Sequence, residues 1–260
     1  MSTILDNIIC NKKNEVERLL KANIDFSKQI TSRNYDRSIV KNILSSNTPG
    51  IIAEFKRQSP SKGIINSQVM AEQVVKQYEE AGAVAASILT DHKYFGGSIE
   101  DIINSRKKTQ LPILRKDFII DPIQIDQAAA IGADVILLIA SALTKKEIYR
   151  LTQHAQQIGL EVLLEVHEEK ELEKACSEID LLGVNNRDLH TFNIDYKRSK
   201  KLLSKIGNDF IAISESGLSQ TEVVSDLYTS GFKGFLMGEN FMKTTDPGRT
   251  CKEFIQELKS

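Results

Sequence analysis

The sequence predicts an α/β fold in which strands and helices alternate along most of the chain. Eight short apolar runs, separated by helical stretches, follow one another from about residue 51 onward. The runs are nearly continuous in Val, Ile, Leu and Ala, as in parallel strands that are covered on both faces. Eight such units in about 210 residues predict a TIM (β/α)8 barrel with an N-terminal helical extension.

The N-terminal extension is expected to be helical. Apolar side chains recur at helical spacing among lysines and glutamates over residues 3–22, which predicts a helix there. A second short helix is predicted over residues 36–44, and the Pro-Gly pair at 49–50 then breaks the chain. We expect residues 1–48 to form this extension and residues 1–260 to form a single barrel domain.

The eight strands follow in order, each with a helical stretch behind it. They are predicted over residues 51–55, 85–90, 113–116, 135–140, 161–166, 181–185, 210–214 and 234–237. Several helix starts resemble capping boxes, and several helix ends carry glycine before the next strand. The capping pairs are Ser98 with Asp101, Thr144 with Glu147 and Ser219 with Glu222, and the glycines are Gly82, Gly132, Gly159 and Gly231. The last helix is expected to begin at Asp246-Pro247.

An open, doubly wound sheet is the alternative fold with the same alternation. Such a sheet often carries a G-x-G-x-x-G turn after its first strand, or a P-loop. Neither motif occurs in this sequence, where the first strand runs into QSPSKG. The barrel is therefore the preferred prediction.

Composition excludes several classes of function. The formal charge is -1, so nothing indicates a nucleic-acid partner. The first twenty residues are polar and charged, so we expect neither a signal peptide nor a membrane partner. The three cysteines are scattered, with neither metal-ligand nor disulfide spacing, and the histidines are not spaced as a metal site. These residues are Cys10, Cys176, Cys251, His92, His154, His167 and His190. We therefore expect a cytoplasmic protein and no metal.

Charged and amide side chains collect at the C-terminal ends of six of the eight predicted strands. These side chains include Glu54, Lys56, Lys116, Asp117, Glu165, His167, Asn185, Asn186, Arg187, Glu215, Glu239 and Asn240. The strand bodies and strand starts carry few of them, whereas solvated surface charges would be spread over both ends. In a TIM barrel the C-terminal ends of the strands build the active site. The pattern therefore predicts an active site rather than a solvated set of ion pairs.

The loops after the last two strands are typical of a phosphate site. Ser216-Gly217 and Gly238-Glu239 follow these strands, and loops at this position commonly bind a phosphate through backbone N–H groups. Lys56 and Ser59 from the first loop are expected to complete such a site. Phe95 and Phe118, also in strand-end loops, either flank an apolar or aromatic group or serve ordinary packing.

Seven segments of the sequence, taken in order, resemble one enzyme family. They are IIAEFKRQSPSKG, ILTDHKYFGGS, ILRKDFIID, LLEVH, GVNNRDL, ISESGL and FLMGE. The chain resembles indole-3-glycerol phosphate synthase from about residue 3 to its end. The resemblance implies a carbon–carbon lyase (carboxy-lyase) of tryptophan biosynthesis. Its small-molecule substrate, 1-(2-carboxyphenylamino)-1-deoxyribulose 5-phosphate, becomes indole-3-glycerol phosphate with loss of carbon dioxide and water, without a metal or an organic cofactor.

The resemblance also implies catalytic roles. Lys116 in RKDF is expected to be the general acid that protonates the ketone oxygen, with a pKa lowered by burial. Glu165 in LLEVH is expected to be the acid–base group of the later dehydration. Glu54 is expected to orient the lysines and relay a proton, in a coupled pair with Lys56, which would bind a substrate anion.

Other residues are expected to hold the substrate. Substrate positioning is expected from Asn185, Glu215 and Ser216, with further contacts from Arg187 and Ser59. The phosphate is expected to be bracketed mainly by main-chain groups of Ser216, Gly217, Gly238 and Glu239. The carboxylate of Glu239 would then turn away from it. Leu137 and Ile139 are expected to line an apolar slot, and His167 is not expected to touch the substrate.

Two other readings of the site stay open at this point. One is an aldolase-type lyase that forms a Schiff base between Lys116 or Lys56 and a phosphosugar ketone. The other is a non-catalytic barrel that only binds phosphosugars, although such a barrel would not need the acid–base set. We expect a monomer, and weak self-association stays open.

Overall fold

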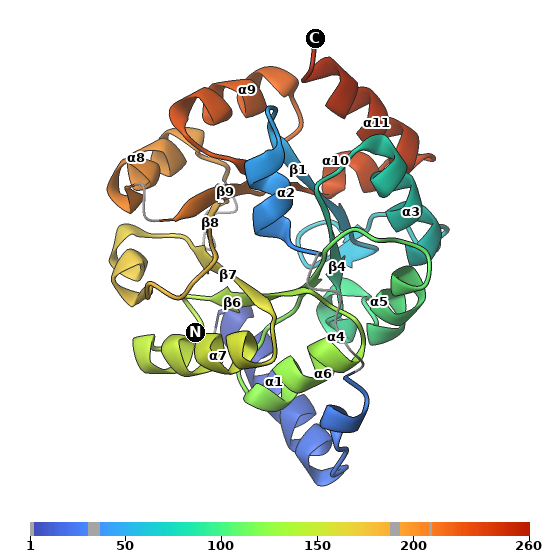
Figure 1. Cartoon of the computed structure of the whole chain (residues 1–260), viewed down its shortest axis with the longest axis vertical. Helices are drawn as coiled ribbons and strands as arrows, with labels where there is room; N and C mark the ends of the chain where they lie inside the picture. Colours follow the sequence, from blue (N-terminus) through green and yellow to red (C-terminus); the bar gives the residue numbers. More distant parts are fainter. Residues whose placement is uncertain (1–2, 31–36, 188–192, 208–209) are drawn as a thin grey trace.

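The structure, a computed structural model, is a closed barrel of eight parallel strands surrounded by helices (Figure 1). It describes residues 3–30, 37–187, 193–207 and 210–260. The strands are β1 (Gly50–Phe55), β4 (Ala85–Leu89), β5 (Ile113–Lys116), β6 (Val135–Ile139), β7 (Glu161–Val166), β8 (Leu181–Asn185), β9 (Ile211–Glu215) and β10 (Gly234–Met237). Because β1 pairs with both β4 and β10, the sheet closes on itself. The predicted barrel is confirmed, each strand to within one residue at either end.

Within the residues that the structure describes, seven longer helices cover the outside of the barrel. They are α3 (Ala71–Ala81), α5 (Ile99–Arg106), α6 (Pro122–Ala130), α7 (Lys145–Gln157), α8 (Tyr196–Ile206), α9 (Thr221–Ser230) and α11 (Pro247–Glu257). Shorter elements not predicted from the sequence are α4 (His92–Phe95), α10 (Glu239–Met242), the 3-10 helix η2 (Glu169–Lys174) and the hairpin of β2 (Gln58–Ser59) and β3 (Gly63–Ile64). The hairpin and the two short helices all lie beyond C-terminal strand ends, where the loops build the site.

The predicted helix caps are confirmed in part. The capping box of Thr144 with Glu147 is present. Ser98 caps α5 by accepting from the backbone N–H of Glu100. The prediction for Ser219 was wrong, because α9 begins one residue later, with Gln220 as its N-cap. All four glycines predicted at helix ends have the positive φ that a left-handed C-cap requires.

The N-terminal end of the barrel is closed by α2 (Ile39–Ser45), which lies across its centre in Figure 1. Ile39 and Ile43 pack against the apolar side chains inside the barrel. Glu161 at the start of β7 accepts hydrogen bonds from the hydroxyl of Ser38 and, at 2.8 Å, from the backbone N–H of Ile39. The predicted helix over 36–44 therefore begins at residue 39, and residue 36 lies outside the described residues.

The opposite end of the barrel is covered by α1 (Ile4–Lys21), which begins with a capping box of Thr3 and Asp6. The first turns of α1 place Ile4, Leu5 and Ile8 over the cavity at the C-terminal strand ends. A short 3-10 helix, η1 (Phe26–Lys28), follows. In the described part of the chain, no helix has the length and apolarity needed to cross a membrane.

The two faces of α2 should differ sharply in their sensitivity to truncation. Ile39 is fully buried in the barrel, whereas Leu44 on the same helix is 66% exposed. Ile39→Ala is expected to lower the free energy of unfolding by about 2–5 kcal/mol, because it leaves a cavity under the strands. Leu44→Ala should change it by less than about 0.5 kcal/mol. Equal midpoints for the two variants in urea unfolding would contradict this role of α2.

Candidate active site

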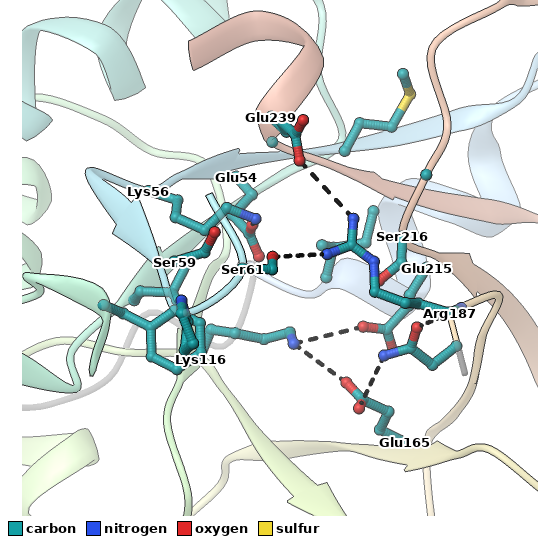
Figure 2. A pocket seen from close by; sticks show the side chains of 18 of the residues that line it. Glu54, Lys56, Ser59, Ser61, Lys116, Glu165, Arg187, Glu215, Ser216 and Glu239 are labelled. Atoms are coloured by element: carbon teal, nitrogen blue, oxygen red, sulfur yellow. Dashed lines mark hydrogen bonds and ion pairs between the residues drawn. The ribbon is translucent and has the colours of Figure 1, made fainter. Parts of the chain in front are cut away.

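A cavity of about 430 Å³ opens among the C-terminal ends of the strands, beneath α1. Every residue predicted to take part in catalysis or substrate binding lines it. Figure 2 labels nine of these residues, together with Ser61. The predicted residues are Glu54, Lys56, Ser59, Phe95, Lys116, Phe118, Leu137, Ile139, Glu165, Asn185, Arg187, Glu215, Ser216, Gly217, Gly238 and Glu239. They come from separate strands because a closed parallel barrel brings all its C-terminal strand ends to one face.

Lys116, the last residue of β5, reaches between two carboxyl groups (Figure 2). Its Nζ lies 3.1 Å from Oε2 of Glu165 and 3.6 Å from Oε2 of Glu215. Burial alone would lower the pKa of this amine, but the charges of Glu165, Glu215 and Glu54 outweigh burial and raise the pKa well above its usual range. The predicted low pKa of Lys116 was therefore wrong. The amine is held as a cation.

The pKa values of the two carboxyl groups beside Lys116 are shifted in opposite directions. Burial opposes ionisation of Glu165, but Lys116 and His167 overcome it, with a hydrogen bond from Asn185, and the pKa of Glu165 falls to about 2. Burial raises the pKa of Glu215 well above its usual range, and the charge of Glu165 raises it further. The cluster therefore combines an ammonium with one carboxyl group of lowered pKa and one carboxyl group of raised pKa.

Two glycines make room for the carboxyl groups of Glu215 and Glu54. A Cβ on Gly183 of β8 would lie 2.0 Å from Oε1 of Glu215. A Cβ on Gly238, after β10, would lie 2.6 Å from Oε1 of Glu54. Such distances are far below van der Waals contact, so any other residue would displace the carboxyl groups. Neither steric requirement can be read from the sequence, because each depends on a neighbouring strand.

Glu54 and Lys56 form the coupled pair predicted from the first segment. Lys56 Nζ lies 2.7 Å from Oε1 of Glu54, and both side chains line the cavity. Glu54 is buried in β1, and its charge is among those that raise the pKa of Lys116. One glutamate therefore acts electrostatically on both lysines.

The mouth of the cavity is crossed by Arg187, which donates a hydrogen bond to the hydroxyl of Ser61 at 3.2 Å (Figure 2). The carboxylate of Glu239 lies 3.8 Å from Nη2 of Arg187 and 3.6 Å from Nζ of Lys62. Glu239 therefore faces the two cations that line the mouth of the cavity, rather than simply turning away from the predicted phosphate position. Ser61 and Lys62 were not singled out in the sequence, although both belong to its first segment.

A left-handed turn follows β9 at Ser216 and Gly217, with φ of 73° and 74°. Positive φ is uncommon for serine, and such outliers cluster at functional sites. The carbonyl of Ser216 accepts from the side-chain amide of Asn186 at 2.8 Å, and that of Gly217 accepts from the hydroxyl of Tyr196 at 2.6 Å. The turn is thus held in place through its carbonyl groups, beside the loop that contains Glu239.

The apolar part of the cavity lies between β6 and two phenylalanines. Leu137 and Ile139 belong to the apolar interior of the barrel, and the rings of Phe95 and Phe118 lie 6.1 Å apart. All four residues line the cavity. The α1 side chains described above complete its apolar wall, and their contribution could not be predicted before the position of α1 was known.

Lys12 anchors α1 to the barrel, and sequence reasoning did not identify it. Its Nζ lies 2.9 Å from Asp91, 2.8 Å from Asp117 and 2.6 Å from Glu15, with the side chain 3% exposed. Burial lowers the pKa of Lys12, but Asp117 and Asp91 more than compensate, so its pKa is raised. A signal was present: Lys12 occupies the 4, 8, 12, 16 row of an otherwise apolar helix face.

Asp91 and Asp117 also hold the loops that contain Phe95 and Phe118. Asp91 caps α4, which ends at Phe95, by accepting from the backbone N–H of Tyr94 at 2.8 Å. Asp117 accepts from the backbone N–H of Phe118 at 2.8 Å. Lys12 therefore joins α1 and both aromatic loops in one ion-pair cluster.

His167 lines the cavity. The sequence placed it directly after the fifth predicted strand, but it was not expected to touch the substrate. Its Nε2 lies 3.3 Å from Oε1 of Glu165. His92 and His154 are absent from the lining, and His190 lies outside the described residues, as do Asp188 and Leu189 of the GVNNRDL segment. Within the described ranges, no three His, Cys, Asp or Glu side chains are grouped so that they could hold a metal ion.

Comparison with known proteins gives one consistent result for the sequence. The pattern of the family described as indole-3-glycerol phosphate synthase matches residues 5–254. The chain is 46% identical to the indole-3-glycerol phosphate synthase of Bacteroides thetaiotaomicron, over 99% of this chain and 100% of that protein. It is 42% identical to that of Petrotoga mobilis over 98% of each, and 43% identical to that of Bacillus cereus over 94% of this chain and 95% of that protein.

Solved structures of low sequence identity share the fold. The alpha subunit of tryptophan synthase from Legionella pneumophila superposes with a TM-score of 0.64 at 11% identity, covering 88% of this chain and 98% of that one. KGPDC from Streptococcus mutans superposes with a TM-score of 0.62 at 15% identity, covering 82% and 98%. At these identities the likeness concerns the barrel alone.

Removing the charge of Lys12 should destabilise the protein. Lys12→Met leaves Asp91 and Asp117 buried without their shared cation, and breaking a buried ion pair costs about 3–5 kcal/mol. Lys13→Met, at the exposed neighbouring position, is the matched control and should stay within about 0.5 kcal/mol of the wild type. Urea unfolding measures both. A Lys12→Met protein as stable as the control would show that the cluster does not hold α1.

The low pKa of Glu165 should make stability depend on pH. Glu165 binds its proton more weakly in the folded protein than in the unfolded chain, so the stabilisation is complete above its ordinary pKa of 4.5 and is lost as pH falls towards about 2. The shift corresponds to roughly 3 kcal/mol at most. Lys116→Met removes the main cause, so its unfolding free energy should fall less steeply than that of wild type across this range.

Lys108→Met, an exposed substitution, should leave the pH dependence of unfolding unchanged. Denaturant unfolding at a series of pH values from about 5 to 2 provides the comparison. Parallel curves for Lys116→Met and wild type would contradict the assigned pairing of Lys116 with Glu165.

Proposed function

The chain belongs to the indole-3-glycerol phosphate synthase family, and we propose that the cavity under α1 is where it carries out that family's reaction. The reaction converts 1-(2-carboxyphenylamino)-1-deoxyribulose 5-phosphate to indole-3-glycerol phosphate in tryptophan biosynthesis. It closes a ring, releases carbon dioxide and then releases water. The position of Lys116, between an apolar slot and two buried acids, supports the proposal most strongly.

The proposed orientation of the substrate follows from polarity. Its aromatic ring takes the slot formed by Leu137, Ile139, Phe95 and Phe118, while its phosphate takes the mouth beside the Ser216–Gly217 turn. Arg187 and Lys62 supply positive charge at the mouth, and Glu239 must release them as the phosphate enters. The loops after β9 and β10, which contribute Gly217 and Gly238, are the usual place for a phosphate in this fold. Lys56 and Ser59 complete the polar wall of the cavity around the proposed phosphate position.

Lys116 is the proposed general acid of ring closure. The aromatic carbon that carries the carboxylate attacks the ketone carbon, and the ketone oxygen takes a proton from Nζ as its negative charge develops. The raised pKa guarantees that this proton is present at neutral pH. It also makes Lys116 a weaker acid than the sequence suggested, so transfer occurs only to an oxygen that has become strongly basic. Loss of carbon dioxide then restores the aromatic ring.

Dehydration is assigned to the two acids. Glu165, ionised at rest, takes the proton that the five-membered ring must lose. Glu215, whose pKa is raised by burial and by the charge of Glu165, supplies the proton with which the hydroxyl leaves as water, and it takes up a proton from solvent before the next turnover. Glu165 then returns its proton to Lys116 across the 3.1 Å contact. Asn185 donates to Oε1 of Glu165 at 3.2 Å and keeps this carboxylate directed at Lys116.

The aldolase-type alternative is less well supported. A Schiff base requires a neutral amine, and the carboxylates around Lys116 hold it in the charged form. Lys56 is likewise paired with Glu54 at 2.7 Å. A barrel that only binds phosphosugars would not need an ammonium in contact with two buried carboxyl groups of oppositely shifted pKa.

We extend the proposal to the setting in which the chain works. It binds a small-molecule substrate, and we propose that it acts as one domain and as a monomer, without a metal or an organic cofactor. Free cysteines at positions 10, 176 and 251 are consistent with the proposed cytoplasmic location, because reducing compartments keep thiols free.

Turnover of 1-(2-carboxyphenylamino)-1-deoxyribulose 5-phosphate, followed by the fluorescence of the indole product, tests the proposed roles. Wild type should form product, and Lys116→Ala should lower kcat by about 10²–10⁴-fold because it removes the general acid. Lys108→Ala, an exposed lysine, is the control and should match wild type. Wild type that folds and binds substrate without forming product would leave a phosphosugar-binding barrel. A borohydride-trapped adduct on Lys116 would instead favour the Schiff-base chemistry.

A further inference from the structure

Asn186 and Tyr196 lie outside the cavity, yet both bind the turn of Ser216 and Gly217 at its mouth. Asn186 directly follows β8 and is fully buried, and Tyr196 is the first residue of α8. Neither is among the residues that line the cavity. Because α8 lies on the outside of the barrel beside β8 and β9, both side chains approach the turn from outside (Figure 1). The mechanism proposed above gives neither residue a role.

The side-chain amide of Asn186 is fixed by its partners. Its Oδ1 accepts a short hydrogen bond from the hydroxyl of Ser199 in α8. Its Nδ2 donates to the carbonyl of Ser216 at 2.8 Å and to the hydroxyl of Ser214 at 3.1 Å. A carbonyl oxygen can only accept, so the nitrogen of the amide must face Ser216. The backbone N–H of Asn186 also donates to the carbonyl of Glu215 at 2.8 Å, so Asn186 is held to β9 through both its backbone and its side chain.

Tyr196 binds the next peptide group of the same turn. Its hydroxyl donates to the carbonyl of Gly217 at 2.6 Å. Burial raises the pKa of Tyr196, so the hydroxyl keeps the proton that this hydrogen bond needs. Two successive carbonyl groups, those of Ser216 and Gly217, are therefore both held from the side of α8.

These two contacts decide where the N–H groups of the turn point. In a planar trans peptide the N–H points away from the carbonyl, and the described residues contain no cis peptide bond. Because Asn186 holds the carbonyl of Ser216, the N–H of Gly217 points to the opposite side, towards the cavity. Because Tyr196 holds the carbonyl of Gly217, the N–H of Leu218 points there too. Both residues line the cavity, and neither N–H donates to another described residue.

We propose that Asn186 and Tyr196 are positioning residues for the phosphate of the substrate: by fixing two successive peptides, they direct the N–H groups of Gly217 and Leu218 at it. Successive N–H groups in such a turn form a concave anion site. Because these groups are already oriented, binding requires no ordering of the turn. The phosphate does not react, so the contact should lower KM without changing kcat. The inference rests on the phosphate position proposed above.

Tyr196→Phe tests this, because it removes only the hydroxyl. We expect the Kd of inorganic phosphate, measured by calorimetry, and the KM of the substrate to rise about 3- to 10-fold, the effect of one hydrogen bond. The kcat should change by less than about twofold. Asn186→Asp keeps the shape but replaces the donor by an oxygen, and should raise both constants about 10-fold or more. Tyr149→Phe is the matched control: Tyr149 is exposed on α7, with its hydroxyl bound to Gln153, so all three constants should match wild type.

The kcat distinguishes positioning from a merely structural role. Glu215 directly precedes the turn, so a variant that only loosened this loop would lower kcat as well. A fall in kcat as large as the rise in KM, or an unchanged Kd of phosphate in Tyr196→Phe, overturns the inference. Should Asn186→Asp not fold, Tyr196→Phe decides alone.

Arg187→Gln, measured in parallel, separates this inference from the proposals on which it rests. Loss of the guanidinium at the mouth should raise the Kd of phosphate. If it does so while Tyr196→Phe binds phosphate like wild type, only the role of Asn186 and Tyr196 fails. Wild type that does not bind phosphate would overturn the phosphate position and this inference together. Wild type that binds phosphate but forms no product would overturn the proposed function, and the phosphate Kd of Tyr196→Phe would still decide the inference.

Discussion

Neutralisation of buried charge at the C-terminal end of the barrel is the constraint on which the site depends. Two lysines and three glutamates share one cavity, where an unpaired charge would cost several kcal/mol. Lys56 is balanced by Glu54 and Lys116 by Glu165, while burial and the charge of Glu165 raise the pKa of Glu215. The cluster therefore keeps a cationic amine and two carboxyl groups of oppositely shifted pKa within reach of one another, an arrangement suited to acid–base chemistry.

The same principle holds the roof of the cavity. Lys12 brings a positive charge from α1 to Asp91 and Asp117, two acids that lie just beyond strand ends. Because these acids also bind the backbone beside Phe95 and Phe118, the ion pairs position the helix and the aromatic loops together. The N-terminal extension thus contributes to both ends of the barrel: α2 fills its base, and α1 covers the cavity at the C-terminal strand ends.

Much of the fold and site could be predicted because the signals are local. Strand positions follow from short apolar runs, and a parallel barrel places every C-terminal strand end on one face. Lys116, Glu165, Asn185 and Glu215 could thus be assigned to one site from their places in the chain. Ser219 was wrongly predicted to cap α9. A helix that begins one residue later shows no difference in the local sequence pattern.

By itself, the sequence determined the barrel, the family and which strand-end residues meet in the cavity, since these follow from residue type and spacing. Only the tertiary structure decided their electrostatic state, because a pKa depends on neighbours from other strands. Burial alone suggested an easily deprotonated Lys116, whereas three converging glutamates make it a firmly held cation. The contact of His167 with Glu165 and the place of α1 over the cavity likewise depend on distances across the barrel, which the order of residues does not contain.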